Sequence, residues 1–175
     1  MSLNLGKRIA IIGPSCSGKS TLASHLAARM NVPVLHLDQA AHHHGSNWQR
    51  IPDSELIATQ KELLLHDSWV IEGNYRVCMP ERFAKADTVL WLDPPLIGCM
   101  WRYLLRCMGK GDRHGGLPGA TKEFSWALIR YTFNNYPKNK AHYERFLAQI
   151  PHLQVIRITS FRDVKLFMDT AATQS

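Results

Sequence analysis

The sequence predicts a doubly wound α/β domain, in which helices cover both faces of a parallel sheet. Short apolar segments alternate along the chain with segments that carry apolar residues at helical spacing. The predicted strands, such as 8–12 and 88–92, are continuous apolar runs, as expected for strands buried on both faces. A chain of 175 residues is long enough for one such domain, and we expect residues 1–175 to form it.

The first half of the chain predicts strands and helices in strict alternation. In order, these are a strand over 8–12, a helix over 18–30, a strand over 34–37, a helix over 53–66, a strand over 69–71, a short helix over 80–86 and a strand over 88–92. Pro33 ends the first helical pattern, and Asp53 is the expected N-cap of the second helix.

The second half predicts more helix and a single strand. The elements are a helix from Pro94 to about Met108, a loop over 109–120, helices over 121–135 and 138–149, a strand over 154–158 and a final helix capped by Ser160. The loop contains five glycines and a proline, and Pro137 is expected to separate the two middle helices.

Charge is concentrated in one part of this basic chain, whose formal net charge is +7. Residues 102–145 hold nine basic and three acidic residues, so we expect an anionic ligand there. No segment approaches the roughly 20 apolar residues that span a bilayer, and no cleavable signal pattern opens the chain. A cytoplasmic protein with reduced cysteines and no membrane partner is therefore expected.

The strongest motif lies between the first strand and the first helix. Residues 13–20 match the pattern G-x-x-x-x-G-K-[ST] of the P-loop (Walker A motif) in full. The predicted contacts with the phosphates of ATP come from the loop and the first turn of the helix, that is, from Gly13, Pro14, Ser15, Cys16, Ser17, Gly18, Lys19, Ser20 and Thr21. Lys19 is expected to neutralise the β- and γ-phosphates during transfer, and Ser20 to hold Mg²⁺.

Acidic residues follow three other predicted strands, at the sheet edge where ligands bind in such folds. Asp38 is a candidate to accept a proton from an acceptor hydroxyl, and either Glu72 or Asp93 to orient Mg²⁺. Alternatively, these acids cap the turns that follow the strands. His36 is expected to share a face with Asp38 and either line the cleft or serve as a satisfied buried histidine.

Two further features favour a structural explanation. The run His42–His44 lacks an acid or cysteine at ligand spacing, so a solvated loop is expected there in preference to a metal site. Cys16 is expected to be a small filler of the loop, with a redox switch as the alternative.

The basic stretch predicts a lid over residues 102–120. Arg102 and Arg106 are four residues apart on a helix and share a face, and Arg113 follows in the glycine-rich loop. Such arginines can close over the transferred phosphate and stabilise its charge. The alternative is an exposed basic helix with solvated arginines.

Taken together, the motifs resemble the adenylate-kinase-like branch of P-loop proteins, and most of all the family of DNA topology modulation proteins related to FlaR. The resemblance extends over nearly the whole chain, and its pieces are GPSCSGKST, HLDQ with Trp48 nearby, WVIEGNY, ADTVLWLD, the arginine-bearing helix and RITSFRDVKLF. It implies a P-loop NTPase fold of the nucleotide-kinase type, with a helical lid and the strand order 2-3-1-4-5.

The resemblance also implies roles for individual residues. Glu72 is similar to the acid of the acid-glycine pair in nucleotide kinases, where Asp is usual. Asn74, Tyr75 and Arg76 would face the acceptor. The loop Thr159–Arg162 would lie beside the adenine, with Arg162 binding the nucleotide. In addition, the family's lid arginines are matched by Arg102, Arg106 and Arg113.

Three functions are compatible with these features. The first is a kinase that transfers the γ-phosphate of Mg²⁺-ATP to a small acceptor, for instance a nucleoside, a nucleotide or another hydroxyl or phosphate. The second is a nucleic-acid-binding protein that modulates DNA topology, and the third is a nucleotide-sensing regulatory ATPase. The chain has no helix-turn-helix, zinc module or aromatic-interleaved basic strand, so nucleic acid is the less favoured partner. The sequence identifies neither the acceptor nor the oligomeric state.

Overall fold

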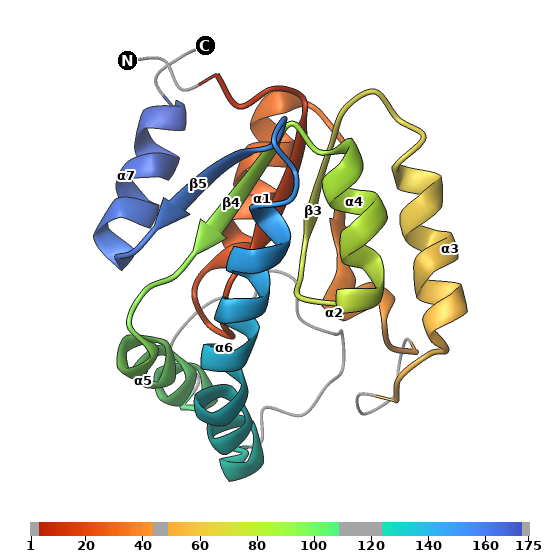
Figure 1. The fold of residues 1–175 in the computed structure, drawn as a ribbon. Helices are drawn as coiled ribbons and strands as arrows, with labels where there is room; N and C mark the ends of the chain where they lie inside the picture. Colours follow the sequence, from red (N-terminus) through yellow and green to blue (C-terminus); the bar gives the residue numbers. More distant parts are fainter. Residues whose placement is uncertain (1–3, 44–48, 109–123, 173–175) are drawn as a thin grey trace.

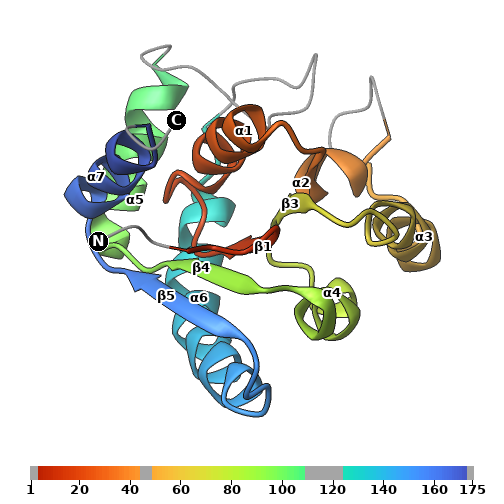
Figure 2. The same cartoon turned by 90° about the horizontal axis from the view of Figure 1, so that it is seen from above.

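The computed structural model describes residues 4–43, 49–108 and 124–172. A five-stranded parallel sheet with the order β2-β3-β1-β4-β5 lies between two layers of helices (Figures 1 and 2). The predicted doubly wound fold and its strand order are therefore confirmed.

The strands are β1 (Arg8–Ile12), β2 (Val34–His36), β3 (Trp69–Glu72), β4 (Thr88–Leu92) and β5 (Gln154–Ile158). The helices are α1 (Lys19–Met30), α2 (Leu37–Ala40), α3 (Asp53–Leu63), the 3₁₀ helix η1 (Arg76–Cys78), α4 (Met79–Lys85), α5 (Leu96–Cys107), α6 (Trp126–Leu147) and α7 (Phe161–Ala172). Of the helices in the described ranges, none has the length and apolar character needed to cross a bilayer.

Each face of the sheet has its own apolar core. On one face, Ile9 and Ile11 of β1 pack with residues of α1 and α7. On the other, Ala10 and Ile12 pack with residues of α3, α4 and α6. The two helix layers are seen edge-on in Figure 2. Because successive strand residues point to opposite faces and both faces are buried, β1 is apolar from Ile9 to Ile12.

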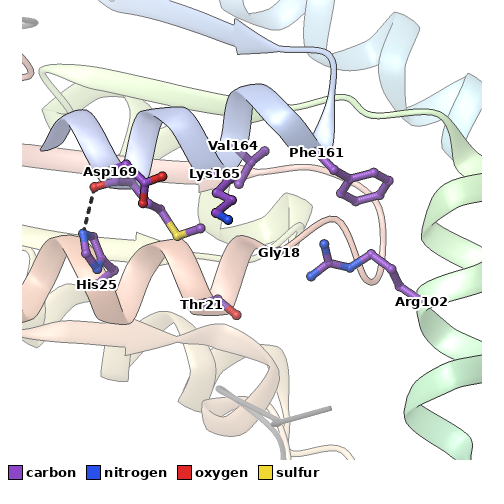
Figure 3. Close-up of a pocket in the computed structure, with 9 residues that line it drawn as sticks. Gly18, Thr21, His25, Arg102, Phe161, Val164, Lys165 and Asp169 are labelled. Carbon is purple, nitrogen blue, oxygen red and sulfur yellow. Dashed lines mark hydrogen bonds between the residues drawn. The ribbon is translucent and has the colours of Figure 1, made fainter. Parts of the chain in front are cut away.

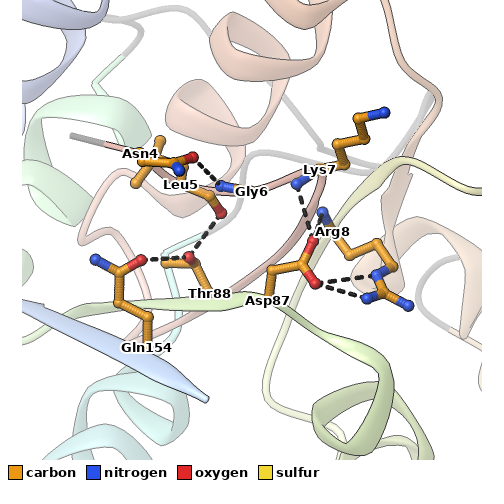
Figure 4. Close-up of polar contacts among 8 residues, drawn as sticks. All are labelled: Asn4, Leu5, Gly6, Lys7, Arg8, Asp87, Thr88 and Gln154. Carbon is orange, nitrogen blue, oxygen red and sulfur yellow. Dashed lines mark hydrogen bonds and ion pairs between the residues drawn. The ribbon is translucent and has the colours of Figure 1, made fainter. Parts of the chain in front are cut away.

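The amino ends of β1 and β4 are joined by Asp87, at the opposite end of these strands from the P-loop (Figure 4). Its Oδ2 accepts hydrogen bonds from the backbone N–H groups of Lys7 and Arg8, both at 2.9 Å, and its Oδ1 lies 2.7 Å from Nη2 of Arg8. The Thr88 hydroxyl adds a 2.7 Å bond to the Leu5 carbonyl. These bonds fix the register of the strand that leads into the loop.

The predicted break at Pro137 is wrong, because α6 runs unbroken through that residue. Proline at a helix interior removes one backbone hydrogen bond. On either side of it, however, Tyr136, Tyr143 and Leu147 are buried. Packing of this helix face against the sheet therefore outweighs the local preference. Ser125 caps the helix, and its side chain accepts a bond from Leu128 N.

Two predicted boundaries also need correction. The second strand ends at His36, and Leu37–Ala40 form the short helix α2, so Asp38 lies on a helix. Asp53 is the first residue of α3, whose N-cap is Pro52, and its carboxylate pairs with Arg50 at 2.5 Å. The predicted cap of α7 is confirmed, since Ser160 Oγ accepts from Asp163 N at 3.0 Å.

Candidate active site

The loop between β1 and α1 is tightly held against the sheet. Gly13 and Gly18 have φ angles of 148° and 102°, which L-residues rarely adopt. A side chain at Gly13 would overlap the carbonyl oxygen of Leu92. Cys16 also has a positive φ, at 62°, although it is not glycine. This geometry brings the chain to the start of α1, whose first N–H groups have no partner within the helix.

Asn74 fixes the first residue of this loop. Its Oδ1 accepts from Gly13 N at 3.2 Å, and its Nδ2 donates to Gly13 O at 2.6 Å. Both ends of the amide are therefore engaged by one residue. Asn74 is thus bonded to the P-loop backbone, and its predicted role at the acceptor stays a prediction.

The ammonium group of Lys19 contacts the backbone of the P-loop. The residue is only 8% exposed, and its Nζ donates to Pro14 O at 3.0 Å. A buried ammonium group next to the first N–H groups of a helix attracts anions. The contact of Lys19 with the phosphates of a nucleotide stays a prediction.

Glu72, at the carboxyl end of β3, is completely buried beside the first turn of α1. Its Oε1 accepts from Ser20 Oγ at 2.9 Å and lies 3.0 Å from His36 Nδ1. Its Oε2 is buried and has no hydrogen-bond partner in the described structure. Burial raises the pKa of Glu72, but hydrogen bonds from His36 and Ser20 and the charge of Lys19 outweigh it, so the pKa lies below its usual value.

These residues fit Mg²⁺. Magnesium binds oxygen ligands, usually one or two from the protein together with substrate phosphates and water. Ser20 Oγ supplies one such oxygen, and the orphaned Oε2 of Glu72 is a buried acceptor that a hydrated cation would satisfy. Within the described ranges, no group of three or more His, Cys, Asp or Glu residues could hold a metal by itself.

Asp38 lies near this centre. Burial and the neighbouring charge of Glu72 raise the pKa of Asp38 above its usual range. The Tyr75 hydroxyl donates a hydrogen bond to the Asp38 carboxylate, and the guanidinium of Arg50 lies 5.5 Å from the Tyr75 ring centre. His36 does not share a face with Asp38 as predicted, because the strand ends between them.

Asp93, the other candidate metal acid, is engaged elsewhere. Its carboxylate accepts from Tyr136 Oη at 2.7 Å and from Arg157 Nη2 at 2.5 Å, and it lies 3.0 Å from Lys140 Nζ. These contacts tie β4 to β5 and α6. Of the two acids proposed for Mg²⁺, only Glu72 therefore meets Ser20.

The predicted arginines occupy different places. Arg76 donates to Asn139 of α6 at 2.8 Å. Arg102 of α5 stacks over the ring of Phe161, with its Cζ 4.8 Å from the ring centre. Arg106 lies 5.7 Å from the ring centre of Tyr103.

A pocket of about 440 Å³ adjoins the P-loop between α1, α5 and α7 (Figure 3). It is lined by Gly18, Thr21, His25, Arg102, Phe161, Val164, Lys165, Met168 and Asp169. The resemblance pointed to the loop before α7 but named Arg162, which is exposed and does not line the pocket. Phe161 falls within the predicted loop 159–162, although the prediction did not single it out. Lys165 was missed, and its position one helical turn after Phe161 on the same face of α7 was the available signal.

The remaining predictions concern loops and thiols. His42 Nδ1 lies 2.7 Å from Asp38 O, which places this histidine against α2. His44, Trp48 and Arg113 lie outside the described residues. The four cysteines, all in the described ranges, are free thiols, and burial raises the pKa of Cys16. A raised pKa disfavours the reactive thiolate that a redox switch needs.

Comparisons with known proteins agree with this geometry. The family model described as "AAA domain" matches residues 8–95, half of the chain, from β1 to the end of β4. The crystal structure of shikimate kinase from Aquifex aeolicus vf5 is similar in fold, with a TM-score of 0.54 and 16% identity, over 96% of this chain and 99% of that one. No curated protein matches the sequence. The chain therefore belongs to the AAA domain family and has the fold of P-loop kinases.

Proposed function

We propose that this protein is a phosphotransferase that moves the γ-phosphate of Mg²⁺-ATP to a hydroxyl or phosphate of a small acceptor. The observation that carries the proposal is the meeting, at one edge of the sheet, of the P-loop lysine Lys19 with the Ser20–Glu72 pair. One element binds polyphosphate and the other binds its counterion, as phosphoryl transfer requires.

In this proposal, the phosphates of ATP occupy the loop and the base enters the adjoining pocket. Backbone N–H groups at the start of α1 and the ammonium of Lys19 face the phosphates. The pocket volume of about 440 Å³ lies within the range typical of small-molecule sites. Arg102 and Phe161 offer flat surfaces on which a purine can stack.

Ser20 and Glu72 would hold Mg²⁺, which supplies positive charge where the transferred phosphoryl group gathers negative charge. Asp38 would accept the proton of an acceptor hydroxyl. Its raised pKa brings it closer to the working pH than an ordinary carboxylate, which favours proton transfer. Tyr75 would orient Asp38 through their hydrogen bond. We further propose a single domain over 1–175, with residues 102–120 as the lid.

Asp38 and Tyr75 also mark the acceptor end of this arrangement. Arg76 would contribute to it only after leaving Asn139, to which its guanidinium now donates. Arg106 and Arg113 are proposed to reach the transferred phosphate from the lid. Membership of the topology modulation group rests on the motifs of the sequence alone.

The test is a panel of nucleosides, nucleotides and sugars, each incubated with Mg²⁺-ATP while release of ADP is followed. We expect one acceptor class to raise ADP release sharply, and Lys19→Ala to abolish the increase. Lys7→Ala, at an exposed lysine outside the site, is the matched control. Slow hydrolysis that no acceptor changes would favour a nucleotide sensor. DNA binding that persists without ATP and in Lys19→Ala, and weakens steeply with salt, would favour a nucleic-acid function.

A further inference from the structure

A chain of hydrogen bonds links two serines of α1 to the ends of β2 and β3. Ser20 Oγ bonds Glu72 Oε1 at 2.9 Å, His36 Nδ1 lies 3.0 Å from the same Oε1, and His36 Nε2 lies 3.3 Å from Ser24 Oγ. Ser20 and Ser24 are one helical turn apart and share a face of α1. The four side chains therefore form a closed ring with the helix backbone.

The two carboxylate oxygens of Glu72 differ in their contacts. Oε1 accepts both available bonds, and Oε2 is left buried without a partner in the described structure. Because a carboxylate can only accept, the Ser20 hydroxyl must donate its proton to it. The lone pairs of Ser20 are then free for a cation on the other side.

His36 is well placed to maintain this arrangement. Its side chain is 10% exposed, and Glu72 beside it is 0% exposed. The His36 imidazole with its hydrogen on Nδ1 donates to Glu72 and accepts at Nε2 from the Ser24 hydroxyl, so one tautomer satisfies both contacts. Without His36, the carboxylate would lose its second donor and could rotate, and Ser20 would no longer hold a single orientation.

We propose that His36 is a positioning residue for the metal site. It holds Glu72 so that Oε2 and the Ser20 oxygen together face the Mg²⁺ of the bound nucleotide. This inference rests on the proposed function, because it concerns the same cation. Residues that orient metal ligands from behind typically change metal affinity about 10- to 100-fold when they are replaced.

The test separates the metal from the nucleotide. Binding of a non-hydrolysable ATP analogue is measured by calorimetry in EDTA and over a series of Mg²⁺ concentrations. His36→Gln carries its amide nitrogen near the Nε2 position and should lose the bond to Glu72. His36→Asn carries it near the Nδ1 position and should keep that bond. His66→Leu, at an exposed histidine, is the control.

We expect His36→Gln to bind the analogue in EDTA within about twofold of the natural protein but to need about 10-fold or more Mg²⁺ for full affinity. His36→Asn should reach full affinity at nearly the Mg²⁺ concentration that the natural protein needs. The proposal is overturned if His36→Gln keeps the natural Mg²⁺ dependence, or if both variants lose affinity equally with and without the metal. Failure of the natural protein to bind the analogue would instead refute the proposed function.

Circular dichroism melting of each variant accompanies the titrations. A variant that unfolds below the assay temperature is replaced by Ser24→Ala, which removes only the far contact of the His36 ring. That variant should need more Mg²⁺ than the natural protein for full affinity and should leave binding in EDTA unchanged. If Ser24→Ala reaches full affinity at the same Mg²⁺ concentration as the natural protein, the proposal is overturned.

Discussion

Asn74→Ala removes both side-chain hydrogen bonds that hold Gly13, at 3.2 Å and 2.6 Å. A neutral hydrogen bond contributes about 1 kcal/mol, and a buried group left unpaired costs about 1–3 kcal/mol. Gly13 is buried, but relaxation or water can satisfy part of its backbone. Partial relief leaves a cost of about 1–2 kcal/mol for each of the two unpaired groups, so we expect the free energy of unfolding to fall by about 2–4 kcal/mol.

Urea unfolding, followed by circular dichroism, measures this loss through the midpoint at constant slope. Asn74→Asp preserves the shape and the bond from Gly13 N but sets a carboxylate oxygen against Gly13 O. It should lose at least as much stability and, by its charge, weaken ATP binding. Asn134→Ala, at an exposed position of α6, is the control and should cause no loss. A midpoint of Asn74→Ala equal to that of the natural protein would refute the positioning role.

Three other predictions concern the pocket, the ion pairs and α6. Gly98→Ala adds a Cβ 2.5 Å from the Phe161 ring, so it should weaken ATP binding but leave tripolyphosphate binding unchanged in calorimetry. Equal effects on both ligands would contradict the placement of the base in this pocket. Burial raises the pKa of Asp93, but hydrogen bonds led by that from Arg157 outweigh it and lower the pKa, so Asp93 stabilises the fold above a pH of about 4 and this stability is lost as the pH falls further. Asp93→Asn should therefore reduce the fall of the urea midpoint at acid pH. An unchanged fall would show that Asp93 does not cause it. Pro137→Ala restores a backbone N–H within α6 and should raise the free energy of unfolding by about 1–3 kcal/mol, whereas a lower melting temperature would show that packing requires the proline.

The sequence predicted the fold well where local pattern and tertiary packing agree. β4 is buried throughout, and β1 is buried and apolar after Arg8, because helices cover both faces of the sheet. The predicted bounds of β1, β4 and β5 are those that the structure shows. Pro137 was misread because its helix is held by buried aromatic residues, whose partners on the sheet are distant in sequence. Local propensity gives no information about such contacts.

The site was predictable where one segment carries it. The phosphate cradle depends on consecutive residues and therefore appears as a motif. In contrast, the bonds of Asn74 to Gly13 and of His36 to Glu72 join residues 61 and 36 positions apart. A side chain that serves another element in this way has no local signature.

The most direct test of the account is a crystal structure with Mg²⁺ and a non-hydrolysable ATP analogue. We predict that Nζ of Lys19 leaves Pro14 O, to which it now donates at 3.0 Å, and contacts the β- and γ-phosphates. The analogue's phosphates should also accept from the N–H groups at the start of α1. An analogue bound elsewhere, with Lys19 still on Pro14 and the loop unchanged, would contradict the central claim.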